Sequence, residues 1–245
     1  MKISPREAAR KFADDCFPRA SVVILAGSVV QGGATASSDL DIVVIDDSQP
    51  APFRRTYRAY GWTIEAFVLT RATYPEFFAE SYNSAVPTLQ RMCAEGEVIR
   101  DDGLSEQIVR EAKRDLEGGP MPWSQQEIDM ARYAITEYID DLAGSGKREE
   151  DLCTAAKLVH AVPEFVLRTN GRWIGDGKWM IRCLRSLDEA LCDRWVAALE
   201  TFYATGSKKE LIDEVDRILR PFGGRLSEGF ALYNSLYMPE DDASE

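Results

Sequence analysis

The chain has 245 residues, 45% hydrophobic and 29% charged, so it can form one large or two ordinary globular domains and is too apolar for a disordered chain. Its 29 basic and 41 acidic residues give a net charge of −12, which disfavours extended contact with nucleic acid. No apolar run approaches the roughly 18 residues that cross a bilayer, so no membrane partner is expected.

The N-terminal segment and the cysteines indicate the cellular compartment. Residues 1–15 mix charged with apolar side chains and contain no continuous apolar segment of the kind found in signal peptides. The five cysteines are odd in number and scattered, and the chain has one histidine, so neither a disulfide framework nor a zinc site is expected. We therefore predict a reduced, cytoplasmic protein.

The first half of the chain alternates helical and strand patterns. Ser4 is a candidate N-cap with Pro5 at the first helical position, which predicts a helix that ends near Pro18. Apolar runs at 21–26 and 40–45 predict buried strands, and 54–60 with 63–69 predict two more strands joined by a turn at Gly61-Trp62. Beyond them we expect helices at 73–83, 86–95 and 105–116 and a short strand at 97–100.

The second half of the chain shows helical periodicity alone. The Gly- and Pro-rich segment 117–122 is the best domain boundary, so we predict an α/β (α+β) domain with a mixed sheet over residues 1–119. Apolar residues at three- and four-residue spacing predict an all-α bundle of at least four helices over 120–238, with 187–203 and 208–219 among them and a kink at Pro163. Residues 239–245 are expected to be a disordered tail.

A glycine and a serine follow the first predicted strand. Gly27 allows the backbone to approach a phosphate group closely, and the Ser28 hydroxyl and nearby amides can donate hydrogen bonds to it. A strand followed by Gly-Ser is common, so this pair acquires weight only together with the acidic residues downstream.

Two aspartates open the second predicted strand. Asp39 and Asp41 are two residues apart, so their side chains leave the same face and can reach the same magnesium ions, whereas Leu40 faces the other side. Carboxylates in an otherwise apolar strand are costly unless they lie at an edge or bind metal. The structural alternative is a capped turn that precedes the strand.

Glu65 is the single acid in the apolar segment 62–69. It can bind a metal, or accept the proton of an attacking hydroxyl as a general base. If its strand lies beside that of Asp39 and Asp41, the three carboxylates converge. The alternative is an edge-strand glutamate that faces water.

Segments 27–33 and 38–42 resemble the motif of the nucleotidyltransferase superfamily that includes DNA polymerase β. The motif consists of a Gly-Ser pair, a downstream Gly and then an acidic stretch, here Ser38-Asp39-Leu40-Asp41. The resemblance covers about residues 20–70. It implies a nucleotidyltransferase fold for the first domain, two magnesium ions, and nucleotide contacts from Gly27, Ser28 and Ser38.

The order of domains is most similar to that of aminoglycoside adenylyltransferases of the streptomycin/spectinomycin type, in which a helical domain follows the catalytic one. This resemblance implies that Asp39 and Asp41 bind magnesium and that Glu65 activates the acceptor hydroxyl; from its own chemistry Glu65 is also a candidate metal ligand. Residues 168–173 and 175–179 loosely resemble a stretch in which that group has a Thr-Gly turn and then a Lys that contacts nucleotide phosphate, which implies this role for Lys178; the match departs at Asn170 and in loop length. Lys178 and Arg182 are four residues apart and share a helix face, so both can contact phosphate, although an exposed basic turn is the plainer interpretation.

These observations predict transfer of AMP from ATP to a hydroxyl of a small molecule, with release of pyrophosphate. Residues 1–120 carry 14 basic and 18 acidic residues and residues 121–245 carry 15 and 23, net −4 and −8, which favours a cationic acceptor such as an aminoglycoside. Two alternatives stay open: nucleotidyl transfer to a protein, as in small antitoxin-like members, and a nucleotide-binding module without catalysis. Oligomeric state cannot be read from the sequence.

Overall fold

The computed structural model describes residues 2–33, 35 and 38–231. The chain divides into two compact units, each with its own core. The first contains residues 1–121 together with Gly171–Asp176, and the second contains Pro122–Asn170 and the chain from Gly177 onward. The predicted tail 239–245 lies outside the described residues.

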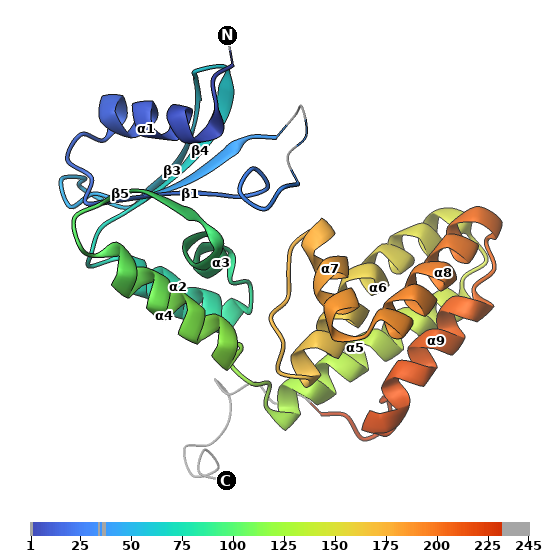
Figure 1. Ribbon diagram of the computed structural model, residues 1–245. Coiled ribbons are helices and arrows are strands. Elements are labelled where there is room, and N and C mark those ends of the chain that lie inside the picture. Colours follow the sequence, from blue (N-terminus) through green and yellow to red (C-terminus); the bar gives the residue numbers. More distant parts are fainter. Residues whose placement is uncertain (1, 34, 36–37, 232–245) are drawn as a thin grey trace, which may run out of the picture. The chain divides into compact units, whose positions relative to one another are not determined.

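The first unit is built on a mixed five-stranded sheet in the order β3-β4-β2-β1-β5. β1 pairs antiparallel with both β2 and β5, β2 pairs parallel with β4, and β3 forms an antiparallel hairpin with β4 (Figure 1). The strands are β1 (Val22–Ala26), β2 (Leu40–Ile45), β3 (Phe53–Ala59), β4 (Trp62–Leu69) and β5 (Glu97–Asp101). The prediction of an α/β unit with a mixed sheet is thereby confirmed.

The β3–β4 turn differs by one residue from its predicted position. Tyr60 and Gly61 form the turn with φ angles of +55° and +80°, and Trp62 belongs to β4. The Trp62 indole N–H donates to the carbonyl of Ile3 at 2.9 Å, and its ring is nearly buried. Burial of this large apolar side chain explains why Trp62 joins the strand, because a turn would leave it in water.

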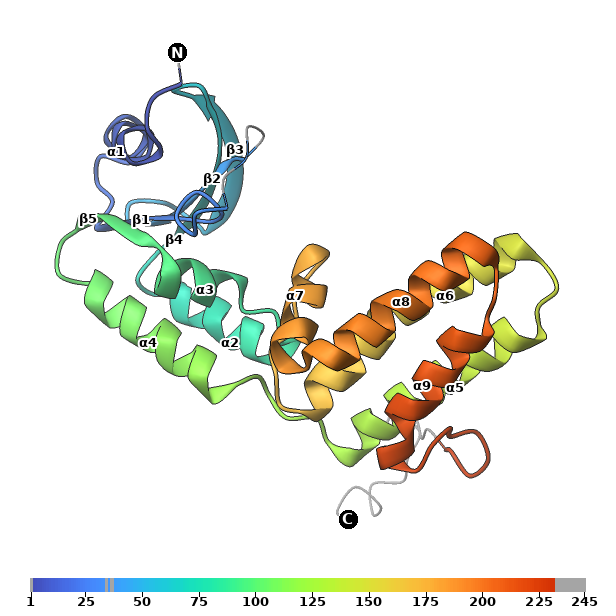
Figure 2. The same ribbon diagram turned by 45° about the vertical axis from the view of Figure 1, so that its right-hand side comes forward.

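Helices cover both faces of this sheet, and alternation along each strand decides which side chains meet them (Figure 1). One face, with Leu40, Ile42 and Val44 of β2, packs against α1, and the sheet curls around this helix in Figure 2. The opposite face, with Val43 and Ile45, packs against α2, α3 and α4. The helices are α1 (Pro5–Cys16), α2 (Tyr74–Ser84), α3 (Thr88–Glu95) and α4 (Ser105–Gly118).

Local signals set the start of the first helix as the sequence predicted. The Ser4 hydroxyl accepts a hydrogen bond from the Glu7 backbone N–H at 3.3 Å, and Pro5 occupies the first helical position. Phe12 is nearly fully buried on the sheet, where it meets Phe17 and Tyr57 edge to face. The helix therefore covers the sheet face that contains Leu40.

The second unit is formed by helices throughout its described part, as predicted. They are α5 (Gln125–Gly144), α6 (Arg148–Thr169), α7 (Lys178–Leu187), α8 (Glu189–Thr205) and α9 (Lys209–Leu219), followed by a 3₁₀ turn at Arg220–Phe222. Ser124 and Glu127 form a reciprocal capping box at the start of α5, and Trp195 is fully buried in the core. α6 continues through Pro163 to Thr169, and the helix expected at 187–203 begins two residues later, because Leu187 ends α7 and Asp188 caps α8.

One segment does not follow the single domain boundary that the sequence predicted at residue 119. Gly171–Asp176 belongs to the first unit, although it lies between α6 and α7 in the sequence. The Trp173 indole N–H donates to the carbonyl of Leu116 at 3.0 Å, and the Ile174 N–H donates to that of Ala85 at 2.9 Å.

No described helix is long and apolar enough to cross a membrane.

Candidate functional site

The backbone turns sharply where β1 ends, and Gly27 makes that turn. Its φ is +80°, a region that L side chains rarely adopt, and a Cβ built on it would lie 2.1 Å from Oδ2 of Asp41. Ala26, the preceding residue, is the Cα partner of Asp41. Glycine at this position therefore lets the β1 turn lie directly against the Asp41 carboxylate.

The segment after Gly27 is a turn closed by its own backbone. The N–H groups of Val30 and Gln31 both donate to the carbonyl of Gly27, at 3.2 and 3.4 Å, and Gly33 donates to that of Ser28 at 3.0 Å. The chain then returns to β2 through Ser38, whose hydroxyl accepts from the Ser28 hydroxyl at 3.2 Å. Gly27, Ser28 and Ser38, predicted as nucleotide contacts, thus form one loop cluster beside the start of β2.

Asp41 and Glu65 are neighbours in space, because β2 and β4 run parallel and pair them directly in register. Both lie on the sheet face that also carries Val43 and Phe67, at the end of that face nearest the Gly27 turn. Asp39 lies two residues before Asp41 and is, like it, partly buried. Leu40 is fully buried on the opposite face, as the alternation predicted.

Glu65 forms an ion pair with Arg54 of the edge strand β3, a contact that the sequence analysis did not identify. The Arg54 guanidinium lies 4.8 Å from the ring centre of Phe67, which is the Cα partner of Arg54 across the hairpin. The Glu65 side chain is 23% exposed and that of Arg54 61% exposed. The position of Arg54 next to Glu65 follows from the register of the β3–β4 hairpin. That register is set by the turn at residues 60 and 61, which the sequence analysis placed one residue later.

The arrangement fits a metal site in part. Carboxylate oxygens are the ligands that magnesium prefers, and Asp39 directly precedes β2 while Asp41 is the second residue of that strand. Within the described ranges, no three His, Cys, Asp or Glu side chains converge closely enough to hold a metal ion. Glu65 would join the two aspartates only if its carboxylate moved away from Arg54.

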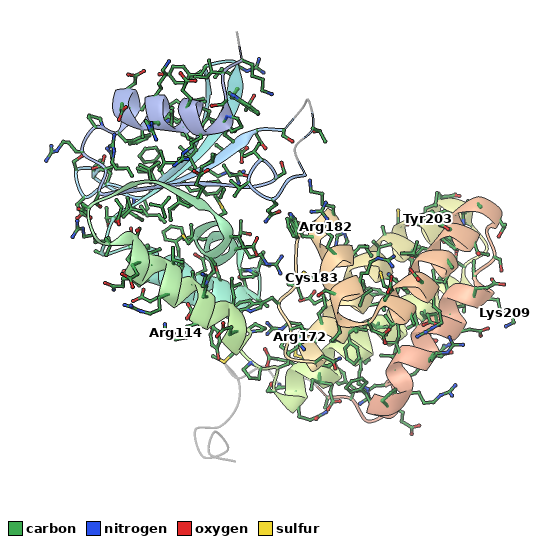
Figure 3. The ribbon with its side chains drawn as sticks, in the orientation of Figure 1. Arg114, Arg172, Arg182, Cys183, Tyr203 and Lys209 are labelled. Carbon is green, nitrogen blue, oxygen red and sulfur yellow. The ribbon has the colours of Figure 1, made fainter. Side chains whose placement is uncertain are left out.

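The two basic residues predicted to contact phosphate, Lys178 and Arg182, lie in the second unit on the first turns of α7. Both are exposed, and the Arg182 guanidinium lies 4.6 Å from the ring centre of Trp179 on the same helix. Arg182 is labelled in Figure 3. Their placement on one helix agrees with their spacing of four residues. Their contact with a nucleotide stays a prediction.

No protein-family model matches the chain, and no curated protein matches it. Among solved structures, the chain is similar to a nucleotidyltransferase-like protein from Exiguobacterium sibiricum 255-15, with 10% sequence identity and a TM-score of 0.47. The match covers 88% of this chain and 74% of that one. At this identity and TM-score, the similarity assigns no function to this chain.

Proposed function

We propose that this chain is a magnesium-dependent nucleotidyltransferase that transfers AMP from ATP to a hydroxyl group of a small molecule. The observation that carries the proposal is the placement of Asp41 between Gly27 and Glu65, its Cα partner on β4. A phosphate-binding turn, a pair of aspartates and a third acid on the neighbouring strand are the groups that such a transfer needs. Their order in the sequence resembles the superfamily of DNA polymerase β.

Each group has a distinct part in the proposed reaction. The N–H groups and hydroxyls around Gly27, Ser28 and Ser38 would bind the phosphates of ATP. Asp39 and Asp41 would hold magnesium, which when bound supplies charge neutralisation at the phosphate groups. The acceptor oxygen attacks the α-phosphorus, Glu65 takes its proton, and the bond from that phosphorus to the β-phosphate oxygen breaks to release pyrophosphate.

The acceptor is proposed from charge and resemblance. A net charge of −12 favours a cationic acceptor over an anionic one, and an aminoglycoside-type antibiotic is one such acceptor. Lys178 and Arg182 are proposed to add a second phosphate contact from the helical unit. The two rival functions, transfer to a protein and nucleotide binding without catalysis, use the same nucleotide site and differ in the fate of the label in the experiment below.

The test is incubation of the full chain with magnesium and α-labelled ATP, GTP, CTP or UTP, alone and with a panel of aminoglycosides, while pyrophosphate release is followed. We expect label from ATP on a small molecule, and none with the double variant Asp39→Asn/Asp41→Asn. Activity retained in that variant would remove the metal-site hypothesis. Label on protein would support transfer to a protein, and nucleotide binding without turnover would support the non-catalytic module.

A second variant separates the two roles of Glu65. With Glu65→Gln, a general base is lost, and the rate is expected to fall by about 10²- to 10⁴-fold. If Glu65 acts only as a base, magnesium-dependent ATP binding in this variant matches that of the wild type. If Glu65 also binds metal, ATP binding weakens together with the rate.

A further inference from the structure

A cavity of about 370 Å³ lies in the first unit, between the β3–β4 hairpin and the helices α2 and α3. Its volume is within the range of about 300–1,000 Å³ that is typical of small-molecule sites. Most of its lining is apolar and comes from both strands and both helices: Phe53, Phe67, Leu69, Phe77, Leu89 and Met92.

The cavity lies next to the carboxylate proposed as the base. Phe67, part of its wall, follows Glu65 by two residues on β4 and has its side chain on the same sheet face, so the two lie about 7 Å apart along the strand. Arg54, which is ion-paired with Glu65 and lies over the Phe67 ring, also lines the cavity. Glu65 itself does not line the cavity, so a substituent of a molecule held there would reach Glu65 once the Arg54 guanidinium moves aside.

Most of the polar side chains that line the cavity lie on one face of α2, and Arg54 of β3 and Thr88 of α3 are the others. Glu80, Ser81 and Ser84 belong to the face of α2 that also contains Phe77. Both serine hydroxyls donate to carbonyls of their own helix, Ser81 to Phe77 at 2.9 Å and Ser84 to Ser81 at 3.3 Å. Glu80 makes no ion pair with any residue that the structure describes, so its charge favours a ligand with a cationic group.

We propose that this cavity binds the acceptor, and that the acceptor joins an apolar ring, held against Phe67 and Phe77, to a hydroxyl that reaches Glu65 and an amine that faces Glu80. The inference rests on the proposed transferase function; it keeps the cationic group of the proposed acceptor and replaces the aminoglycoside-type scaffold with an apolar ring. Aromatic side chains bind flat apolar rings through stacking or edge contacts, whereas a polyhydroxylated sugar would leave its hydroxyls without partners against this wall. An amphipathic ring alcohol therefore fits the cavity better than a purely sugar-based acceptor.

The first experiment measures binding in the absence of ATP and magnesium, so that it does not depend on catalysis. The probe is 4-(aminomethyl)benzyl alcohol, followed by saturation-transfer NMR on the full chain. Ethanolamine tests the need for the ring, and 4-(hydroxymethyl)benzoic acid tests the preference for a cation. We expect the amine probe to bind and both of the others to bind at least about fivefold more weakly, the size of effect that one aromatic contact or charge pair provides.

Matched variants locate the binding site. Ser81→Trp places an indole in the cavity, whereas Ala79→Trp adds the same ring to an exposed position of α2 that does not line it. We expect Ser81→Trp to abolish binding of the probe, Ala79→Trp to retain it, and Phe77→Ala to weaken it by about fivefold. Equal binding by Ser81→Trp and the wild type, or no binding of the ring probe at all, would overturn the proposal.

Transfer assays with the same variants separate this proposal from the one on which it rests. Probe binding without any labelled product supports the cavity and counts against the transferase. Transfer to a ring-free acceptor at the same rate in Ser81→Trp as in wild type supports the transferase and overturns the cavity as its acceptor site.

Discussion

Asp41 of β2 and Glu65 of β4 are Cα partners in a parallel strand pair, so their carboxylates leave adjacent backbones on the same face of the sheet. Adjacent strands lie about 4.8 Å apart, which is close enough for two carboxylates to share one cation or one phosphate-bound metal. In the structure Glu65 is bound to Arg54, and Asp41 lies against Gly27. These contacts determine how each variant below is expected to behave.

Asp41→Asn keeps the size of the side chain and removes its charge. If Asp41 holds magnesium, the ion's stabilisation of the transition state is lost, and transfer from α-labelled ATP should fall by about a thousandfold or more. Asp47→Asn, just past the opposite end of β2, is the control and should retain the rate. A rate for Asp41→Asn within tenfold of wild type would exclude Asp41 as a metal ligand.

Gly27→Ala and Gly32→Ala form a matched pair in one turn. Both glycines have positive φ, +80° and +75°, so alanine should cost each about 1–2 kcal/mol of stability. Only at Gly27 does the new Cβ meet the Asp41 carboxylate; a Cβ added at Gly32 has no described atom within 4 Å beyond its own residue and its two chain neighbours. We expect similar losses in urea unfolding and a much larger loss of ATP binding for Gly27→Ala. Equal ATP binding by the two variants would contradict the role of the close approach.

Arg54→Met removes the cation that holds Glu65 and keeps an unbranched apolar side chain over Phe67. The pair is partly exposed, so its removal should change stability by less than about 1 kcal/mol. If Glu65 joins the metal site, the loss of a competing cation should lower the magnesium concentration for half-maximal rate by roughly two- to fivefold. A magnesium titration checks this, and a raised requirement would instead indicate that Arg54 positions Glu65.

Asp46, directly after β2, is almost fully buried and gives stability that depends on pH. Burial alone would raise its pKa, but hydrogen bonds from the Ser48 hydroxyl, the Gln49 side chain and the Ser48 backbone lower it below its usual value. Because the pKa is lower in the folded than in the unfolded chain, this stability is present above pH ~4 and is lost as the pH falls through the folded value.

The Asp46→Asn variant tests this contribution by urea unfolding between pH 3 and pH 6. We expect a loss of about 1–3 kcal/mol at pH 6 and a smaller difference from wild type at pH 3. A difference that is the same at both pH values would mean that the carboxylate's charge does not contribute.

The sequence by itself determined the parts of this protein that depend on local patterns. Ser4 and Pro5 set the start of α1, the apolar run from Leu40 marks β2, and alternation along β2 puts Asp41 on the face opposite Leu40. The change to purely helical periodicity after residue 122 identified the second unit.

Tertiary structure decided which of these parts meet. The parallel pairing of β2 with β4 brings Glu65 beside Asp41, yet strand order is a matter of contacts between distant segments that no local pattern specifies. The same holds for Arg54, whose contact with Glu65 depends on the hairpin register, and for Trp173, which joins the first unit from beyond α6. The cavity beside Glu65 is likewise formed by four elements, and its shape exists only once they have packed.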